Sequence, residues 1–90
     1  FNIIFSKKDV LRGNHYHKEN REAFYVISGC FDLIAKKDGN QKKYVFKTGD
    51  MFVIPPYVNH SFYYTEDTLL ASMYDIGVEH GDGTKDIYSV

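Results

Sequence analysis

The chain has little of several features on which whole classes of protein depend. A single cysteine, Cys30, excludes both an intramolecular disulfide and a cysteine-based zinc knuckle. The longest apolar runs are about five residues, whereas a membrane-spanning helix needs about 20, so we expect no membrane partner. No charged segment followed by an apolar one opens the chain, and we therefore expect a cytoplasmic location.

An excess of charge of either sign is also lacking. Lys and Arg together number 11 and Asp and Glu 12, which gives a formal net charge of -1. A domain that binds nucleic acid usually carries a clear basic excess, because it must neutralise a phosphate backbone. We therefore expect no nucleic-acid partner and look instead for a small-molecule ligand.

Aromatic residues are abundant, at 17% of the 90 residues, with eight Tyr, seven Phe and no Trp. Aromatic and β-branched residues favour strands, and here they form short runs separated by turn residues about every eight to twelve positions. No segment shows a sustained helical period. The sequence predicts one all-β domain over residues 1–90, with little or no helix and about eight strands, at 1–5, 10–17, 23–27, 30–36, 42–46, 51–54, 60–65 and 69–76, before a last short strand at 87–90.

Some of these strands are apolar on both faces. In the run 23–27, Phe24 and Val26 fall on one face, and Ala23, Tyr25 and Ile27 on the other. A small sandwich with one core needs only one apolar face per strand, so the second face must be covered. We expect a homodimer, since a second copy is the simplest cover.

The first group of candidate functional residues lies around two histidines. His15 and His17 are two residues apart, so in a strand both side chains point to the same face. Glu22 follows after four intervening polar residues and can begin the next antiparallel strand close to them. Glu22 could instead pair with Arg12 or Arg21.

The second group surrounds His60, which opens a later strand whose same face carries Phe62 and Tyr64. Three imidazoles and one carboxylate converging inside a small barrel would suit Zn²⁺, Fe²⁺, Mn²⁺ or Ni²⁺. The candidate metal ligands are His15, His17, Glu22 and His60.

The spacing of these residues resembles the two motifs of the cupin superfamily. The first motif is matched by His15, His17, Glu22 and Gly29, and the second by Gly49, Pro55 and His60. Three positions depart from the family pattern: Asp9 and Tyr57 stand where it has glycine, and Tyr64 where it has asparagine. The resemblance implies a single antiparallel jelly-roll barrel.

Two longer strings, residues 12–18 (Arg-Gly-Asn-His-Tyr-His-Lys) and 54–60 (Ile-Pro-Pro-Tyr-Val-Asn-His), resemble the cupin sugar-nucleotide isomerases. These are the dTDP-linked 3,4-ketoisomerases of polysaccharide biosynthesis, with which the dTDP-4-dehydrorhamnose 3,5-epimerases share a shorter piece. The resemblance implies that Arg12 grips the phosphates of a nucleotide sugar and that His15 is the base, with His17 as the second family histidine. The related enzymes need no metal, whereas this sequence keeps the whole candidate ligand set.

Three functions therefore remain open from the sequence. The first is isomerisation or epimerisation of a nucleotide-linked 4-keto-6-deoxy sugar through an enediol, without a cofactor. His15 or His17 would then be the base, Tyr64 the acid, and Arg12, His60 and Phe62 would bind substrate. The second is a metal-dependent cupin enzyme, a dioxygenase or a metal-assisted isomerase, and the third is a non-catalytic module that binds a sugar or another ligand.

Overall fold

The structure is a computed structural model, and it describes residues 1–74 and 87–89. Within this part of the chain there are nine strands and no helix, and accordingly no helix that could cross a membrane. The strands are β1 (Asn2–Ser6), β2 (Leu11–Tyr16), β3 (Glu22–Ser28), β4 (Cys30–Lys37), β5 (Asn40–Lys47), β6 (Met51–Ile54), β7 (Asn59–Tyr64), β8 (Thr68–Tyr74) and β9 (Tyr88–Ser89).

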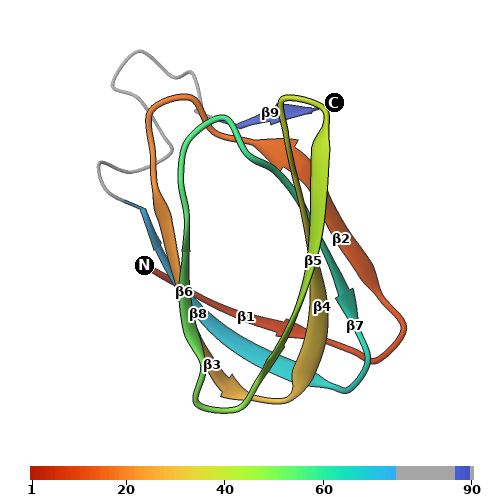
Figure 1. Cartoon of the computed structure of the whole chain (residues 1–90). Helices are drawn as coiled ribbons and strands as arrows, with labels where there is room; N and C mark the ends of the chain where they lie inside the picture. Colours follow the sequence, from red (N-terminus) through yellow and green to blue (C-terminus); the bar gives the residue numbers. More distant parts are fainter. Residues whose placement is uncertain (75–86, 90) are drawn as a thin grey trace.

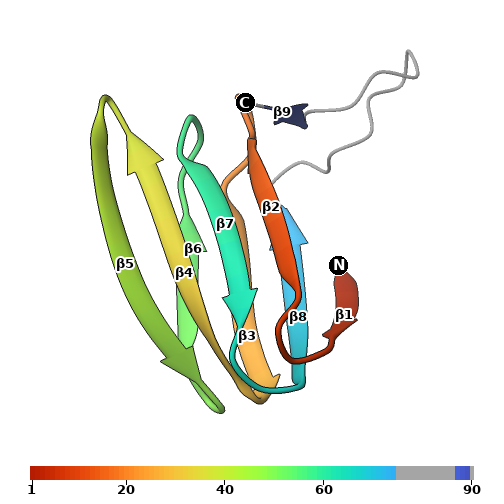
Figure 2. The same ribbon diagram turned by 90° about the vertical axis from the view of Figure 1, so that its right-hand side faces the viewer.

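The strands form two antiparallel sheets that face each other (Figures 1 and 2). One sheet has four strands in the order β1-β8-β3-β6, and the other has five in the order β5-β4-β7-β2-β9. This arrangement is a jelly roll, so the predicted all-β class and barrel architecture are confirmed.

The strand boundaries agree with the predicted ones to within two residues wherever the chain is described. The last two residues of the predicted strand 69–76, and Val90 of the last one, lie outside the described residues. The strand predicted at 42–46 is longer, because the turn at Asp38 and Gly39 has only two residues and Lys37 already pairs with Asn40. Both turn residues have positive φ, 53° and 79°, as a type I′ hairpin requires.

The core lies between the sheets and consists of the inward side chains of alternate residues. Phe31 of β4 is fully buried and stacks on Phe62 of β7, with ring centroids 5.2 Å apart. Phe24 and Val26 are buried from β3, as the alternation predicts. The other buried hydrophobic residues are Leu33, Ile54, Val58, Tyr64 and Leu70.

The opposite face of the four-stranded sheet is apolar and exposed. We call it the outer apolar face; its exposed members are Ile3, Phe5, Tyr25, Ile27, Met51, Val53 and Met73. They come from all four strands, and neighbours in register connect them, such as Tyr25 with Met51. The prediction that strands are apolar on both faces is therefore confirmed for this sheet.

Candidate functional site

Three histidines and a glutamate meet at one end of the barrel. The potential ligand nitrogens of His15, His17 and His60 all lie within 4.8 Å of one another. His15 Nε2 lies 3.1 Å from His60 Nε2, and Glu22 Oε1 lies 3.2 Å from His17 Nε2 and 3.6 Å from His60 Nε2. The structure thus brings together all four candidate metal ligands, although their roles remain a prediction.

The two sheets contribute to this cluster from opposite sides. His15 and His60 come from β2 and β7 of the five-stranded sheet, and His17 follows the end of β2. Glu22 is the first residue of β3 in the facing sheet. As predicted, Glu22 begins a strand close to the histidines, but it approaches across the barrel and not from a strand paired with theirs.

Gly13 allows β2 and β7 to approach each other beside the histidines. Its φ is +109°, and the register shifts between Gly13 and His15. A Cβ at this position would lie 2.6 Å from the backbone oxygen of His60. Only glycine fits this bulge, which turns His15 towards His60.

The environment keeps both His15 and His60 neutral. Burial lowers the pKa of His60 to about 4, against 6.5 for an ordinary imidazole. Burial also lowers the pKa of His15, and the nearby His17 lowers it further. Both rings are therefore uncharged at pH 7 and available as bases or ligands.

Backbone contacts also orient these two rings. His60 Nδ1 donates to the carbonyl of Val58 at 3.1 Å, which leaves its Nε2 as the unprotonated nitrogen. His15 has a backbone hydrogen bond with Gly13, while its Nε2 faces His60. The two Nε2 atoms therefore face each other at hydrogen-bond distance, an arrangement that a shared proton or a cation between them would stabilise.

The cluster can hold a divalent transition metal. Imidazole and carboxylate are suitable ligands for zinc, iron, manganese and nickel. A histidine that ligates a metal usually donates its other ring N–H to a carbonyl or carboxylate, as His60 does to Val58. The close approach of the Nε2 atoms of His15 and His60 is the observation that best fits a bound cation.

A cavity of about 280 Å³ opens beside the cluster. Its walls include six of the predicted site residues and four further ones: Arg12, His15, Glu22, His60, Phe62 and Tyr64, with Ile4, Gly13, Phe24 and Tyr74. His15 and His60 reach this cavity, whereas His17 is buried behind them against Glu22. The geometry thus separates the two members of the His-x-His pair.

Arg12 and Tyr64 are linked through Ser6, which was not among the predicted site residues. Arg12 Nε donates to Ser6 Oγ at 2.8 Å, and Tyr64 also hydrogen-bonds with Ser6. Burial raises the pKa of Tyr64, so its hydroxyl stays protonated. Arg12 thus bonds to Ser6. Glu22 could have paired with an arginine, but in the structure it contacts His17 and His60.

Ser6 and Tyr74 are additions to the predicted site. Ser6 is buried although it begins a polar segment, and nothing in its local spacing points to Tyr64 far along the chain. Tyr74 stands opposite Glu22 in register, and its ring meets that of His17 at 5.1 Å in an edge-on contact. The alternation along the strand predicted at 69–76 could have placed Tyr74 on the inner face.

Comparison with known proteins identifies the family. Residues 4–77 match the model of the cupin domain family. The comparison with curated protein sequences gives no match.

Solved structures show the same fold at low sequence identity. The capsular polysaccharide assembling protein CapF from Staphylococcus aureus has a TM-score of 0.84 and 19% identity, over 98% of this chain and 27% of CapF. The sugar 3,4-ketoisomerase QdtA from Thermoanaerobacterium thermosaccharolyticum, in complex with TDP, has a TM-score of 0.79 and 18% identity, over 99% of this chain and 66% of QdtA.

A third solved structure has a slightly higher sequence identity to this chain than CapF and QdtA have. The dTDP-4-dehydrorhamnose 3,5-epimerase from Sulfolobus tokodaii has a TM-score of 0.64 and 27% identity, over 81% of this chain and 48% of the epimerase. QdtA has also been solved, as a single-site mutant, in complex with TDP-4-keto-6-deoxyglucose. This chain therefore spans only part of each of these relatives, and the likeness to CapF and QdtA concerns the fold.

Proposed function

This chain belongs to the cupin domain family, and on that premise we propose that it isomerises or epimerises a nucleotide-linked 4-keto-6-deoxy sugar. The observation that carries the proposal is the set of groups on one pocket wall: a neutral imidazole, a guanidinium and a protonated phenol, from His15, Arg12 and Tyr64. Further support comes from two relatives of the same fold, a ketoisomerase solved with a TDP-sugar and a sugar epimerase.

His15 is the base in this proposal, because it reaches the pocket and His17 does not. A neutral imidazole takes the proton from the carbon next to the ketone, and the carbonyl oxygen becomes the hydroxyl of an enediol. Return of the proton to the former carbonyl carbon, with loss of the hydroxyl proton from the carbon that was first deprotonated, moves the ketone by one position. Return to the original carbon from the other side inverts that centre instead.

Tyr64 is the acid, since its raised pKa keeps a proton on the hydroxyl that faces the same pocket. Arg12 binds the diphosphate, because its planar guanidinium makes paired, charged hydrogen bonds with phosphate oxygens. Ser6 holds Arg12 and Tyr64 beside each other. His17 and Glu22 orient His60 and His15 from behind, and His60 and Phe62 complete the substrate wall.

Incubation with dTDP-4-keto-6-deoxyglucose in D₂O tests the reaction. We expect deuterium at a carbon next to the ketone, together with a rearranged sugar, both detected by NMR. His15→Asn should lower kcat by about 100-fold or more, as expected for loss of a general base. Tyr16→Phe is the control, because Tyr16 stacks on Tyr88 away from the pocket. An unchanged rate in a His15→Ala, His17→Ala double variant would exclude either residue as the base.

Tyr64 and its neighbour Tyr63 provide a matched test of the acid. Tyr64→Phe should lower kcat at least 10-fold with little change in KM, since it removes only the hydroxyl. Tyr63→Phe removes a hydroxyl that donates to Asp9 on the exposed face of the same strand, and it should leave kcat unchanged. Equal effects of the two substitutions would contradict the role of Tyr64.

A metal-dependent cupin enzyme is the second candidate, favoured by the 3.1 Å approach of the Nε2 atoms of His15 and His60. His15, His17, His60 and Glu22 would hold the ion, which would supply Lewis-acid or redox chemistry to a substrate in the adjoining pocket. Metal analysis of protein purified without chelator separates the candidates. The metal-dependent candidate would be excluded by less than about a tenth of an equivalent of transition metal, together with no rise in Tm on adding Zn²⁺, Mn²⁺ or Ni²⁺.

A non-catalytic ligand-binding module is the third candidate. It is favoured if dTDP-sugars bind in the pocket but neither deuterium exchange nor product appears with or without added metal. We place all three versions in the cytoplasm, where nucleotide-activated sugars are made. Cell fractionation tests that placement.

We also propose that the protein is a homodimer joined through the outer apolar face. Its exposed side chains come from all four strands of the sheet and form one continuous patch. Monomers rarely expose contiguous apolar patches larger than a few hundred Å², whereas a specific dimer buries about 800 Å² per partner. A second copy of the same apolar sheet is the partner that matches this surface in polarity.

A further inference from the structure

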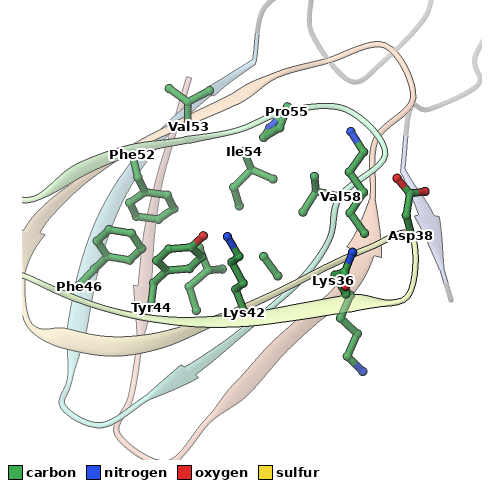
Figure 3. A pocket seen from close by; sticks show the side chains of 14 residues that line it. Lys36, Asp38, Lys42, Tyr44, Phe46, Phe52, Val53, Ile54, Pro55 and Val58 are labelled. Atoms are coloured by element: carbon green, nitrogen blue, oxygen red, sulfur yellow. The ribbon is translucent and has the colours of Figure 1, made fainter.

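A second cavity, of about 540 Å³, opens on the opposite side of the barrel from the histidine pocket. It lies between β5 and β6, the edge strands of the two sheets (Figure 3). Figure 3 shows Tyr44 and Phe46 on β5 facing Phe52 and Ile54 on β6 across the opening. Its volume is within the range of ordinary small-molecule sites, about 300–1,000 Å³.

The walls of this cavity are apolar. Leu33 and Ala35 of β4 also line it, and Val58 lies at one end (Figure 3). Phe46 stacks on Phe52 with centroids 4.0 Å apart, and Tyr44 stacks on Phe46 at 6.1 Å. Flat ring surfaces of this kind suit an apolar ring or a short acyl chain.

The cavity is separate from the histidine pocket. No residue lines both cavities within the described ranges. Phe52 stacks on Phe24 with centroids 4.9 Å apart, and Phe24 lines the histidine pocket, so a wall of phenyl rings stands between them. A ligand of this cavity is therefore not the substrate of the proposed reaction.

The rim of the cavity carries positive charge. Three lysines, Lys36, Lys37 and Lys42, line it with one carboxylate, Asp38, although the whole chain has a net charge of -1. Lys42 lies opposite Ala35 in register and points into the opening (Figure 3). Its neighbour Lys43, on the other face, lies 3.5 Å from Asp32, whereas Lys42 has no carboxylate within ion-pair distance among the described residues.

We propose that this cavity binds a small amphipathic anion, with an apolar ring or short acyl chain against the apolar walls and a carboxylate at Lys42. A sugar would leave its hydroxyl groups unpaired against the apolar walls. A neutral hydrocarbon would leave the lysines without a counter-charge. Pairing with a strand of a second copy is disfavoured, because lysines along an edge oppose edge-to-edge pairing.

Titration with octanoate, followed by methyl NMR of the full chain, tests the proposal. We expect saturable shifts centred on the methyl groups of Leu33, Ala35, Ile54 and Val58. Octylammonium, which has the same chain length and the opposite charge, should bind at least 10-fold more weakly. Equal affinity for the two compounds, or shifts centred on the outer apolar face, would overturn the proposal.

Lys42 and Lys43 provide the matched variants. Lys42→Gln should weaken octanoate binding about 10-fold, because it removes a charged hydrogen bond. Lys43→Gln removes the same charge from the opposite face and should change the affinity less than twofold. Both residues are exposed, so the fold should be retained, which the dispersion of the spectra checks. An equal effect of the two variants, or shifts of the same methyl groups on concentrating the ligand-free protein, would reject the site.

Discussion

His60 is held as a neutral imidazole by burial, and this makes the stability of the fold depend on pH. Its pKa is about 4 in the folded chain and 6.5 in a model imidazole, so below pH 6.5 the unfolded chain binds the proton more readily. The free energy of unfolding should therefore fall as the pH drops from 6.5 towards 4. The loss at pH 4 from this residue is about 3 kcal/mol.

Urea unfolding of chelator-treated protein at pH 7.5 and pH 4 measures this loss. The control is His60→Gln, which cannot take up a proton. Its absolute stability will be lower, but the dependence on pH should be visibly weaker than in the parent chain. Parallel pH profiles for the two proteins would show that His60 does not titrate as described.

At the scale of the strand, Gly13 makes the contact between β2 and β7 possible. Gly13→Ala should lower the free energy of unfolding by about 2 kcal/mol or more, since the new Cβ meets the His60 carbonyl in a backbone with positive φ. Gly39→Ala is the control: φ is also positive there, but the space around it is open. Gly39→Ala should cost about 1 kcal/mol. Equal losses in thermal or urea unfolding would mean that the close approach at Gly13 carries no cost.

Two turns have a left-handed backbone at positions where the cupin pattern has glycine but this chain has another residue. Asp9 and Tyr57 have φ of 69° and 65°. A non-glycine residue in this region costs about 1–2 kcal/mol. Tyr57→Gly should therefore be more stable than Tyr57→Ala by about 1 kcal/mol, because both lose the ring and only glycine relieves the strain. The urea midpoints of the two variants measure this difference. A more stable alanine variant would show that the backbone at residue 57 is not strained.

Local patterns in the sequence were enough to locate the strands, but not their partners in the sheets. Alternation and turn residues marked the strand over 51–54 to the residue, since both signals are local. That Glu22 reaches His17 from the opposite sheet depends on the way two sheets close on each other, which local spacing does not encode. Ser6 was missed for the same reason, because its partner Tyr64 is distant in sequence.

The sequence was enough to predict which residues form the site, but not how they are arranged in space. His15 and His17 were expected on one face, and both join the cluster. The alternation of a strand predicts the same environment for both residues. In the structure, however, His15 lines the pocket and His17 is buried against Glu22. The cavity between β5 and β6 had no motif to mark it, because most of its walls are apolar residues at the edge strands of the two sheets as described.

At the scale of the whole molecule, the proposed dimer depends on the outer apolar face. Val53 of β6 belongs to this face and is 58% exposed, and Val45 of β5 is 64% exposed on the other sheet. Val53→Glu should convert the proposed dimer to a monomer at micromolar concentration, since it places a charge in the proposed apolar interface. Val45→Glu should leave the dimer intact. Light scattering after gel filtration distinguishes the species, and a monomeric parent chain would reject the dimer.

The order of strands in the two sheets has a consequence for how the chain folds. Only β4 and β5 are neighbours both in sequence and in a sheet; every other pairing in the described chain joins strands that are distant in sequence. Chains dominated by such pairings close long loops before they gain contacts, and they fold in milliseconds to seconds rather than microseconds. We therefore expect the β4–β5 hairpin to form early, and the pairs β1–β8 and β2–β9, which close the longest loops, to form late. The histidine cluster draws on β2, β3 and β7, so it assembles only when both sheets have closed.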